Sequence, residues 1–290
     1  MCGTCGCGDL KNVGITSLLP ASAEPRHAFV RSRANVMHQH EADAHDQERA
    51  PVIQAVLENS PPAFKEIELE ESVNRLHLET SLLAKNDTLA ATNRQRFEAL
   101  AVLALNLVSS PGAGKTTLLE ATLSALGDVE CAVIEGDQAT LNDAERIRAT
   151  GTPVVQINTG KGCHLEASMV KDAVDNLELK HKSLLFIENV GNLVCPAMFD
   201  LGEAGKVLIL SVTEGDDKPL KYPHMFRAAQ VIIINKTDLA PYVDFNVEAC
   251  EGWIKELNPT ATIFRLSVKQ PETLVDWLAW LKNSLRQCWE

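Results

Sequence analysis

The feature that most constrains the fold is a phosphate-binding loop between a strand and a helix. Residues 109–116 read Ser-Ser-Pro-Gly-Ala-Gly-Lys-Thr, directly after the apolar segment Leu103–Val108 and before the helical segment Thr116–Leu126. In this context the backbone N–H groups of the loop and of the helix N-terminus face the phosphates of a nucleotide. The sequence therefore predicts an α/β domain built around a nucleotide site.

Individual loop residues have expected roles. Lys115 reaches the β- and γ-phosphates, and the Thr116 hydroxyl binds Mg²⁺. The usual motif has glycine at the first position, where this chain has Ser109. A plain Gly-rich turn before a helix would not explain the Lys-Thr-Thr run. The expected nucleotide-binding residues are Gly112, Ala113, Gly114, Lys115, Thr116 and Thr117.

Strands and helices alternate along the remainder of the chain, which predicts a doubly wound, mostly parallel sheet covered on both faces. The expected strands are Leu103–Val108, Ala132–Glu135, Val154–Ile157, Leu184–Ile187, Val207–Val212, Val231–Ile234 and Thr262–Leu266. The expected helices are Thr116–Leu126, Leu141–Ala149, Leu165–Leu177, Val247–Leu257 and Thr273–Leu285.

The N-terminal third has a different composition. It contains many Pro and polar residues, and no apolar period is sustained before about residue 64, which favours a disordered linker. Its histidines, which could hold a metal weakly or simply belong to a solvated linker, are His27, His38, His40 and His45. We expect four parts: a Cys-rich motif (1–10), a linker (11–63), a helical extension of one or two helices (64–101), and a nucleotide-binding domain (102–290).

Charge and hydropathy exclude several classes of protein. The formal net charge of −12 argues against nonspecific binding to nucleic acid or to an anionic membrane. No apolar run approaches the roughly 20 residues of a membrane span, and the first ten residues lack the features of a secretory signal. We therefore expect a cytoplasmic protein with reduced cysteines.

A second motif predicts which base is bound. Asn235-Lys-Thr-Asp238 ends an apolar strand, at the edge where open α/β sheets bind ligands. The Asp238 carboxylate can accept two hydrogen bonds from guanine, and adenine lacks the matching ring N–H. Lys236 can lie along the base, and Asn235 can brace the loop. The following Ser267–Lys269 is either another base-contacting loop or a plain turn.

Two acidic residues lie where predicted strands end. Asp137 and Glu188 lie at strand ends on the side of the phosphate loop, where each can hold Mg²⁺ or position the attacking water. Asp137 could instead cap the next helix. A carboxylate such as Glu188 at the end of a buried strand needs a partner. Gly191 gives the next loop a possible hinge.

Cysteines gather in two places. Cys2, Cys5 and Cys7 are interleaved with glycines, so that one short loop can wrap a soft or borderline ion such as Ni²⁺ or Zn²⁺. A disordered reactive tail is the alternative. Cys163, His164 and Cys195 could bind a second ion if their two loops meet, with water or a symmetric partner completing the shell.

Together these segments resemble the HypB family of hydrogenase nickel-incorporation GTPases, metallochaperones of the SIMIBI class of P-loop GTPases. The resemblance covers residues 103–290, and the N-terminal Cys-x-x-Cys-x-Cys is similar to the nickel motif of some members. The segments that carry it are Asn106–Thr117, Ile134–Gln138, Thr159–His164, Glu188–Pro196 and Asn235–Asp238.

The resemblance implies a cytoplasmic GTPase that dimerises with nucleotide or metal. It also implies transfer of Ni²⁺ to a [NiFe]-hydrogenase large-subunit precursor, with a HypA-type maturation protein as partner. The residues alone leave open a chaperone for a urease or cobalamin enzyme, or a nickel-buffering protein with a regulatory nucleotide site. A P-loop kinase is a third alternative, against which Asn235–Asp238 argues.

Overall fold

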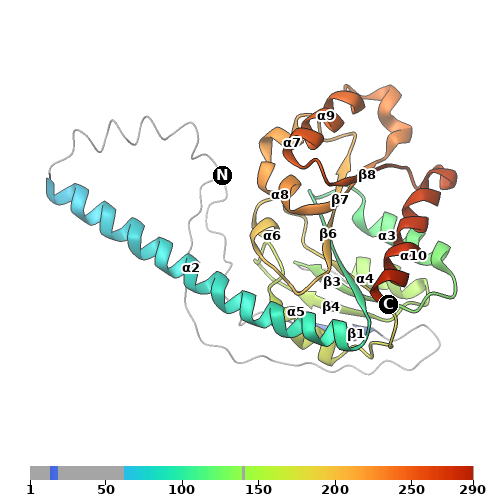
Figure 1. The fold of residues 1–290 in the computed structure, drawn as a ribbon, viewed down its shortest axis with the longest axis horizontal. Coiled ribbons are helices and arrows are strands. Elements are labelled where there is room, and N and C mark those ends of the chain that lie inside the picture. The colour runs from blue at the N-terminus through green and yellow to red at the C-terminus, as the bar shows by residue number, and fades with distance from the viewer. Residues whose placement is uncertain (1–13, 19–61, 139–140, 290) are drawn as a thin grey trace.

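The computed structural model describes residues 14–18, 62–138 and 141–289, and for residues 14, 17, 18 and 62–79 it describes the backbone alone. Within these residues eight strands form one sheet in the order β1-β4-β3-β5-β2-β6-β7-β8 (Figure 1). All pairs are parallel except β1 with β4, so the predicted mostly parallel, doubly wound sheet is confirmed. The strands are β1 (Gly14–Leu18), β2 (Leu103–Ser109), β3 (Cys131–Asp137), β4 (Val154–Asn158), β5 (Leu184–Glu188), β6 (Gly205–Ser211), β7 (Ala229–Asn235) and β8 (Thr262–Arg265).

Helices cover both faces of this sheet, as buried parallel strands require (Figure 1). Helices α3, α4 and α10 lie on one face, and α2, α5, α8 and α9 lie on the other. The α-helices are α2 (Pro62–Ala99), α3 (Lys115–Leu126), α4 (Asn142–Ala149), α5 (Ala167–Asp175), α6 (Cys195–Met198), α7 (Lys218–Lys221), α8 (Pro223–Ala228), α9 (Val247–Leu257) and α10 (Val275–Trp289). Two 3₁₀ segments are η2 (Thr237–Tyr242) and η3 (Pro271–Leu274).

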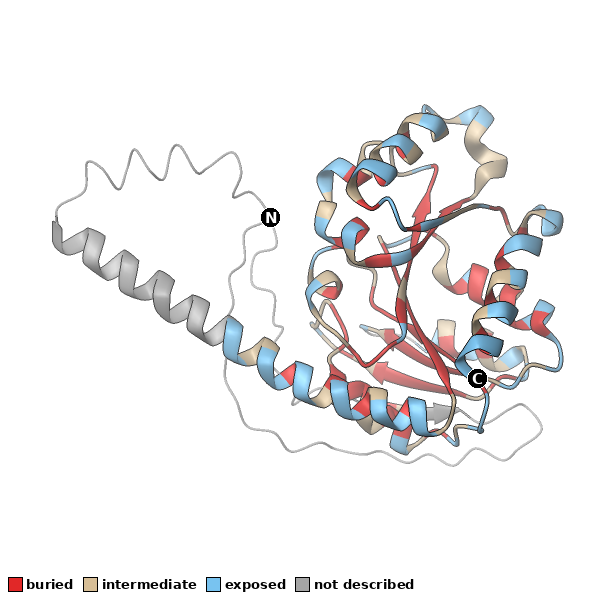
Figure 2. Cartoon of the chain, in the orientation of Figure 1, coloured by how far each residue is buried: buried red, intermediate tan, exposed pale blue. Residues whose placement is uncertain are grey.

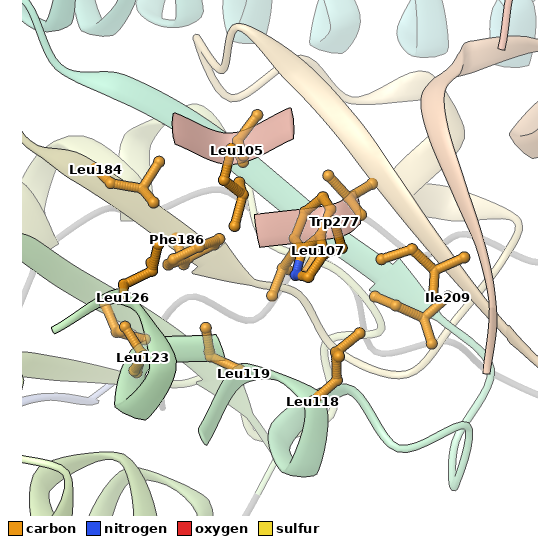
Figure 3. Close-up of a cluster of buried hydrophobic side chains, with 14 of the residues drawn as sticks. Leu105, Leu107, Leu118, Leu119, Leu123, Leu126, Leu184, Phe186, Ile209 and Trp277 are labelled. Carbon is orange, nitrogen blue, oxygen red and sulfur yellow. The ribbon is translucent and has the colours of Figure 1, made fainter. Parts of the chain in front are cut away.

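The strands β2 to β7 are buried on both sides, which explains their nearly continuous apolar sequences (Figure 2). Leu105 and Leu107 of β2 face the leucines of α3, with Phe186 and Trp277 packed around them (Figure 3). The Trp277 Nε1 atom donates a hydrogen bond to the Thr122 hydroxyl at 3.0 Å, so the buried indole keeps a polar partner. This packing fixes α3, and with it the loop that precedes α3.

One feature of the N-terminal third differs from the sequence-based expectation, and another falls within it. Part of the predicted linker forms β1, which pairs antiparallel with the edge strand β4 from Gly14 opposite Asn158 to Leu18 opposite Val154. The five residues were missed because so short a segment, with polar residues at Thr16 and Ser17, sets no clear strand period. The helical extension is one 38-residue helix, α2.

Among the described residues, no helix is both long enough and apolar enough to cross a membrane, and this includes the long helix α2.

Candidate functional site

The phosphate loop opens a cavity at the carboxyl edge of the sheet. The loop joins β2 to α3, and it lines a cavity of about 830 Å³ together with the ends of β3, β5 and β7. The loop and these strand ends lie together because the carboxyl ends of parallel strands meet at one edge of a doubly wound sheet. The predicted residues that line it are Gly112, Gly114, Lys115, Thr116, Thr117, Asp137, Glu188, Asn235, Lys236 and Asp238.

Ser109, which departs from the usual motif, has a partner in the loop. The Lys115 ammonium donates to the Ser109 hydroxyl at 3.0 Å, and that hydroxyl donates to the Ser110 carbonyl at 2.6 Å. Ser109 is fully buried. Ser109 therefore holds Lys115 over the loop. A glycine at position 109 could not accept this hydrogen bond from the Lys115 ammonium.

A cluster of carboxyl groups lies beside the loop. The Thr116 hydroxyl donates to Glu188 Oε1 at 2.7 Å, and Glu188 Oε2 is buried without a hydrogen-bond partner. Glu135, on the neighbouring strand, is in register with Glu188, and its Oε2 is also buried and unpartnered. Burial, followed by the charges of Glu188 and Asp137, raises the pKa of Glu135 to about 9. Burial likewise raises the pKa of Glu188.

Glu135 was not identified from the sequence, although a glutamate inside an otherwise apolar strand was a usable signal. Asp137 lines the same cavity, and its Oδ1 accepts a hydrogen bond from the Gln138 N–H at 2.7 Å. The alternative of a helix cap for Asp137 is wrong, since α4 begins at Asn142 with Leu141 in the capping position. A second residue missed by sequence reasoning is Arg146 of α4, whose guanidinium donates to the Thr117 hydroxyl at 3.0 Å.

The Asn235–Asp238 segment is tied to the phosphate loop. The Asn235 amide donates to the Ala113 carbonyl at 2.9 Å, which confirms that it braces the loop, and the Lys236 ammonium donates to the Gly112 carbonyl at 2.7 Å. Asp238 Oδ1 accepts a hydrogen bond from the Ser267 hydroxyl at 2.5 Å. The loop Ser267–Lys269 lines the cavity beside Asp238, which places it where a base-contacting loop would lie.

The second predicted cluster assembles from two loops. Cys163 and His164 follow β4, and Cys195 begins α6, seven positions after Glu188. The two sulfur atoms lie 3.1 Å apart, the His164 Nδ1 atom lies 3.5 Å from Cys163 Sγ, and one ligand atom from each residue falls within 4.8 Å of the others. Because metal–sulfur bonds are about 2.3 Å long for Zn²⁺, one ion can reach all three.

The electrostatics of this cluster suit a metal ligand set. The hydrogen bond from Cys163, helped by His164, lowers the pKa of Cys195 to about 4 against the opposing effect of burial. A thiolate is the form of cysteine that binds metals. His164 is buried, its ring lies 4.0 Å from that of Phe199, and its Nε2 atom has no hydrogen-bond partner. A buried ring whose Nε2 atom lacks a hydrogen-bond partner, and whose Nδ1 atom lies 3.5 Å from Cys163 Sγ, fits a metal-binding residue.

The two sites share a loop. Asn189, next to Glu188, accepts a hydrogen bond from the Leu165 N–H at 3.1 Å, and the Asn192 amide donates to the Cys163 carbonyl at 3.2 Å. The segment that leaves the nucleotide cavity is therefore bonded directly to the segment that carries Cys163 and His164.

The other predicted metal ligands and the remaining cysteines fall into two groups. Cys2, Cys5 and Cys7 lie outside the described residues, as do the histidines of the predicted linker. Among the remaining thiols, burial raises the pKa of both Cys131 and Cys250 to about 12, and Cys288 is exposed.

A phosphate loop at the carboxyl edge of a parallel sheet, with an Asn-Lys-x-Asp segment braced against it, defines a P-loop nucleotide-binding α/β protein. Comparison with known families agrees: the CobW/HypB/UreG nucleotide-binding domain matches residues 103–265. The chain belongs to the CobW/HypB/UreG family.

Its relatives are close. Hydrogenase maturation factor HypB of Escherichia coli (strain K12) is 60% identical over 209 residues, which are 72% of this chain and 72% of that protein. Hydrogenase/urease maturation factor HypB of Helicobacter pylori (strain ATCC 700392 / 26695) is 41% identical over 239 residues, 81% of this chain and 95% of that protein. The crystal structure of H. pylori HypB in complex with nickel superimposes with a TM-score of 0.68 at 44% identity, covering 70% of this chain and 96% of that one.

Proposed function

We propose that this chain is a GTP-hydrolysing nickel metallochaperone that supplies Ni²⁺ to a [NiFe]-hydrogenase large-subunit precursor during maturation. One observation carries the proposal: a nucleotide cavity and a Cys-His-Cys cluster are joined by the short loop from Glu188 to Cys195. A relative with 60% identity is a hydrogenase maturation factor, and a structural relative with 44% identity holds nickel.

Mg²⁺ fits the donors around the phosphate loop. Hard cations prefer oxygen ligands, and the free Glu188 Oε2 and Glu135 Oε2 atoms are buried acceptors that lack hydrogen-bond partners. Thr116, Asp137 and Glu188 would hold the ion directly or through water. When bound, Mg²⁺ supplies positive charge that offsets the charge developing on the β- and γ-phosphate oxygens.

The remaining groups of the cavity act on the nucleotide itself. The loop backbone and Lys115 hold the phosphates, with Lys115 positioned by Ser109. Asp238 accepts hydrogen bonds from guanine and would reject adenine, which leaves the carboxylate without a donor. Glu188 or Asp137 positions the attacking water.

Ni²⁺ is the cargo in this proposal, and Zn²⁺ is a competing occupant of the Cys163, His164 and Cys195 cluster. Cys2, Cys5 and Cys7 would form a second nickel site. Nucleotide exchange moves the Glu188 loop, which changes the position of Cys195 and so releases or retains the ion. We further propose a cytoplasmic location, a homodimer that forms with nucleotide or metal, and a HypA-type protein as the partner.

The test is complementation of a hydrogenase-positive strain from which the chain's own gene is deleted. The wild-type chain should restore hydrogenase activity and nickel incorporation at low external nickel. Lys115→Ala and Cys195→Ser should restore neither, and the exposed control variant Glu145→Gln should restore both. Full restoration by Lys115→Ala would reject a role for nucleotide hydrolysis.

Urease maturation is a second candidate, because the H. pylori relative is a hydrogenase/urease maturation factor. Urease activity measured in the same deletion strain, or in a strain supplied with urease genes, separates the two. Loss of urease activity with intact hydrogenase activity would favour the second candidate.

A further inference from the structure

Two buried asparagines on α2 lie over the loops that carry Cys163, His164 and Cys195. Asn86 and Asn93 are spaced seven residues apart, which places them on the same face of a helix, and both are at least nine-tenths buried. The C-terminal half of α2 runs beside α5 in the fold (Figure 1). Asparagine is a weak helix former, and a buried amide is costly unless it is hydrogen-bonded. Helix stability alone therefore does not account for two asparagines on this face.

Each amide bridges the same two segments. The Asn93 Nδ2 atom donates to the Ala167 carbonyl at 2.9 Å and to the Leu201 carbonyl at 3.0 Å. The Asn86 Nδ2 atom donates to the Asp200 carbonyl at 2.7 Å, and its Oδ1 atom accepts from the Ala167 N–H at 2.9 Å. Ala167 lies three residues after His164, and Asp200 lies five residues after Cys195. Each asparagine therefore connects the segment just after Cys163 and His164 in the sequence to the segment just after Cys195.

The contact between α2 and the Cys195 segment is too close for a side chain. Gly202 has a φ of +90°, and a Cβ atom there would lie 2.6 Å from the Ala90 carbonyl oxygen and 2.7 Å from Asn93 Cβ. Arg94, beside Asn93, donates to both carboxylate oxygens of Asp200 at 2.7 and 2.8 Å. These contacts hold the segment against the helix independently of the two amides.

We propose that Asn86 and Asn93 are positioning residues for the Cys163, His164 and Cys195 metal site, and that α2 is the element that holds its two loops in register. This inference rests on the function proposed above. The ligands come from loops that follow different strands, so their separation depends on how those loops are joined. A single amide nitrogen that donates to both loops fixes that separation. Partners that orient metal ligands typically change affinity by about 10- to 100-fold when removed.

The test uses the full chain with Cys2, Cys5 and Cys7 replaced by serine, so that binding reports on the internal cluster. Co²⁺ is titrated by the thiolate-to-metal charge-transfer absorption, and Ni²⁺ by competition with Co²⁺. In this background Asn93→Ala should weaken Co²⁺ binding by at least about 10-fold and reduce or shift the absorption band. Asn86→Ala should do so as well, while both variants keep GDP affinity within about twofold because α2 does not line the nucleotide cavity.

Two control variants separate positioning from loss of stability. Leu281→Ala removes a buried side chain of α10 on the opposite face of the sheet, and it should lower the melting temperature without changing the absorption band. Thr92→Ala truncates the exposed neighbour of Asn93, whose hydroxyl bonds only within the helix, and it should behave as the parent. Unchanged Co²⁺ affinity in a folded Asn93→Ala protein would overturn the inference. So would an equal loss in Leu281→Ala.

Failure of the proposed function gives a different result. Cys195→Ser in the same background should abolish the charge-transfer band. If Cys195→Ser leaves metal binding intact, the cluster itself is not a metal site. If Cys195→Ser abolishes binding and neither asparagine variant changes it, the cluster stands and the positioning role is rejected.

Discussion

Gly191 lies directly against Pro111 of the phosphate loop. A Cβ atom at Gly191 would lie 3.0 Å from both the Cα and the backbone nitrogen of Pro111. The absence of a side chain at Gly191 therefore lets the two loops approach each other closely. The sequence predicted a different role for this glycine, as a hinge. The loop that ends at Cys195 thus touches the loop that would hold the phosphates.

Gly191→Ala should weaken GDP binding by about 10-fold, or about 1.4 kcal/mol, because either Pro111 or the Glu188 loop must shift to admit the methyl group. Fluorescent GDP titration measures the change. Gly252→Ala in α9 is the matched control, since a Cβ atom there meets nothing within 4 Å. Equal GDP affinity in the two variants would show that the contact is not needed for the shape of the cavity.

Asp238→Asn should switch preference from GTP toward xanthosine triphosphate. Xanthine carries a carbonyl where guanine carries its exocyclic amino group, so an amide N–H can replace the carboxylate as its partner. Loss of a charged hydrogen bond costs about 1.5–3 kcal/mol, so GTP affinity should fall by about 10- to 150-fold. Competition binding with both nucleotides measures this. A loss of GTP binding with no gain for xanthosine triphosphate would mean that Asp238 does not read the base.

Lys115→Ala should reduce GTP turnover by at least about 100-fold, because the phosphates lose their positioned ammonium. Nickel binding by Cys2, Cys5 and Cys7 should remain, since a short thiol motif does not need the nucleotide cavity. Phosphate release and Ni²⁺ titration measure the two properties in the same preparation. Loss of tight nickel binding in a folded Lys115→Ala protein would contradict this independence.

Glu135→Gln should stabilise the nucleotide-free and Mg²⁺-free protein more at pH 8.5 than at pH 6. The pKa of Glu135 is about 9 in the folded chain and about 4.3 in an unfolded one. The folded state therefore keeps a proton that the unfolded state has lost, and wild-type stability falls as the pH rises between these values.

A neutral glutamine removes this pH dependence. The stabilisation by Glu135→Gln should be larger at pH 8.5 than at pH 6 by at most about 3 kcal/mol, because each pH unit contributes about 1.4 kcal/mol. Urea unfolding at the two pH values measures it, with exposed Glu145→Gln as the control. A stability gap that stays constant with pH would show that Glu135 is ionised in the folded state.

Nucleotide state should change metal affinity at the Cys163, His164 and Cys195 cluster. Typical coupling is about 1–3 kcal/mol, so we expect about 5- to 150-fold between GDP and a nonhydrolysable GTP analogue, and linkage requires metal to change nucleotide affinity equally. Ni²⁺ and Zn²⁺ titrations of a chain lacking the N-terminal thiols measure it. Equal affinities at matched oligomeric state would rule the coupling out, and Cys195→Ala should remove it.

The phosphate loop and the Asn235–Asp238 segment were predictable because each motif has a fixed place relative to a strand. The hydrogen bond from Asn235 to the Ala113 carbonyl is possible because β2 and β7 both end at the carboxyl edge of one parallel sheet. The sequence could predict a metal site at Cys163 and Cys195 only on the condition that their loops meet. The loops follow β4 and β5, and these strands are not adjacent because β3 lies between them.

Other parts could not be predicted from local pattern. The pairing of β1 depends on a partner 140 residues away, and the bridging role of Asn93 depends on two carbonyls that have no sequence signal. Glu135 carried a sequence signal, an acidic residue in an apolar strand, but its place beside Glu188 depends on the pairing of β3 with β5.

The direction of β1 bears on where the N-terminal thiols can be. Gly14 pairs with Asn158, so the chain enters the sheet at the carboxyl edge, where β4 leads into the segment with Cys163 and His164. Gly14 lies seven positions after Cys7, and a chain segment of that length spans at most about 25 Å. A metal held at Cys7 is therefore tethered within that radius of Gly14, which keeps it at a high effective concentration for ligands at this edge. Exchange of an ion between the two predicted thiol sites would then be an intramolecular event, independent of how dilute the protein is.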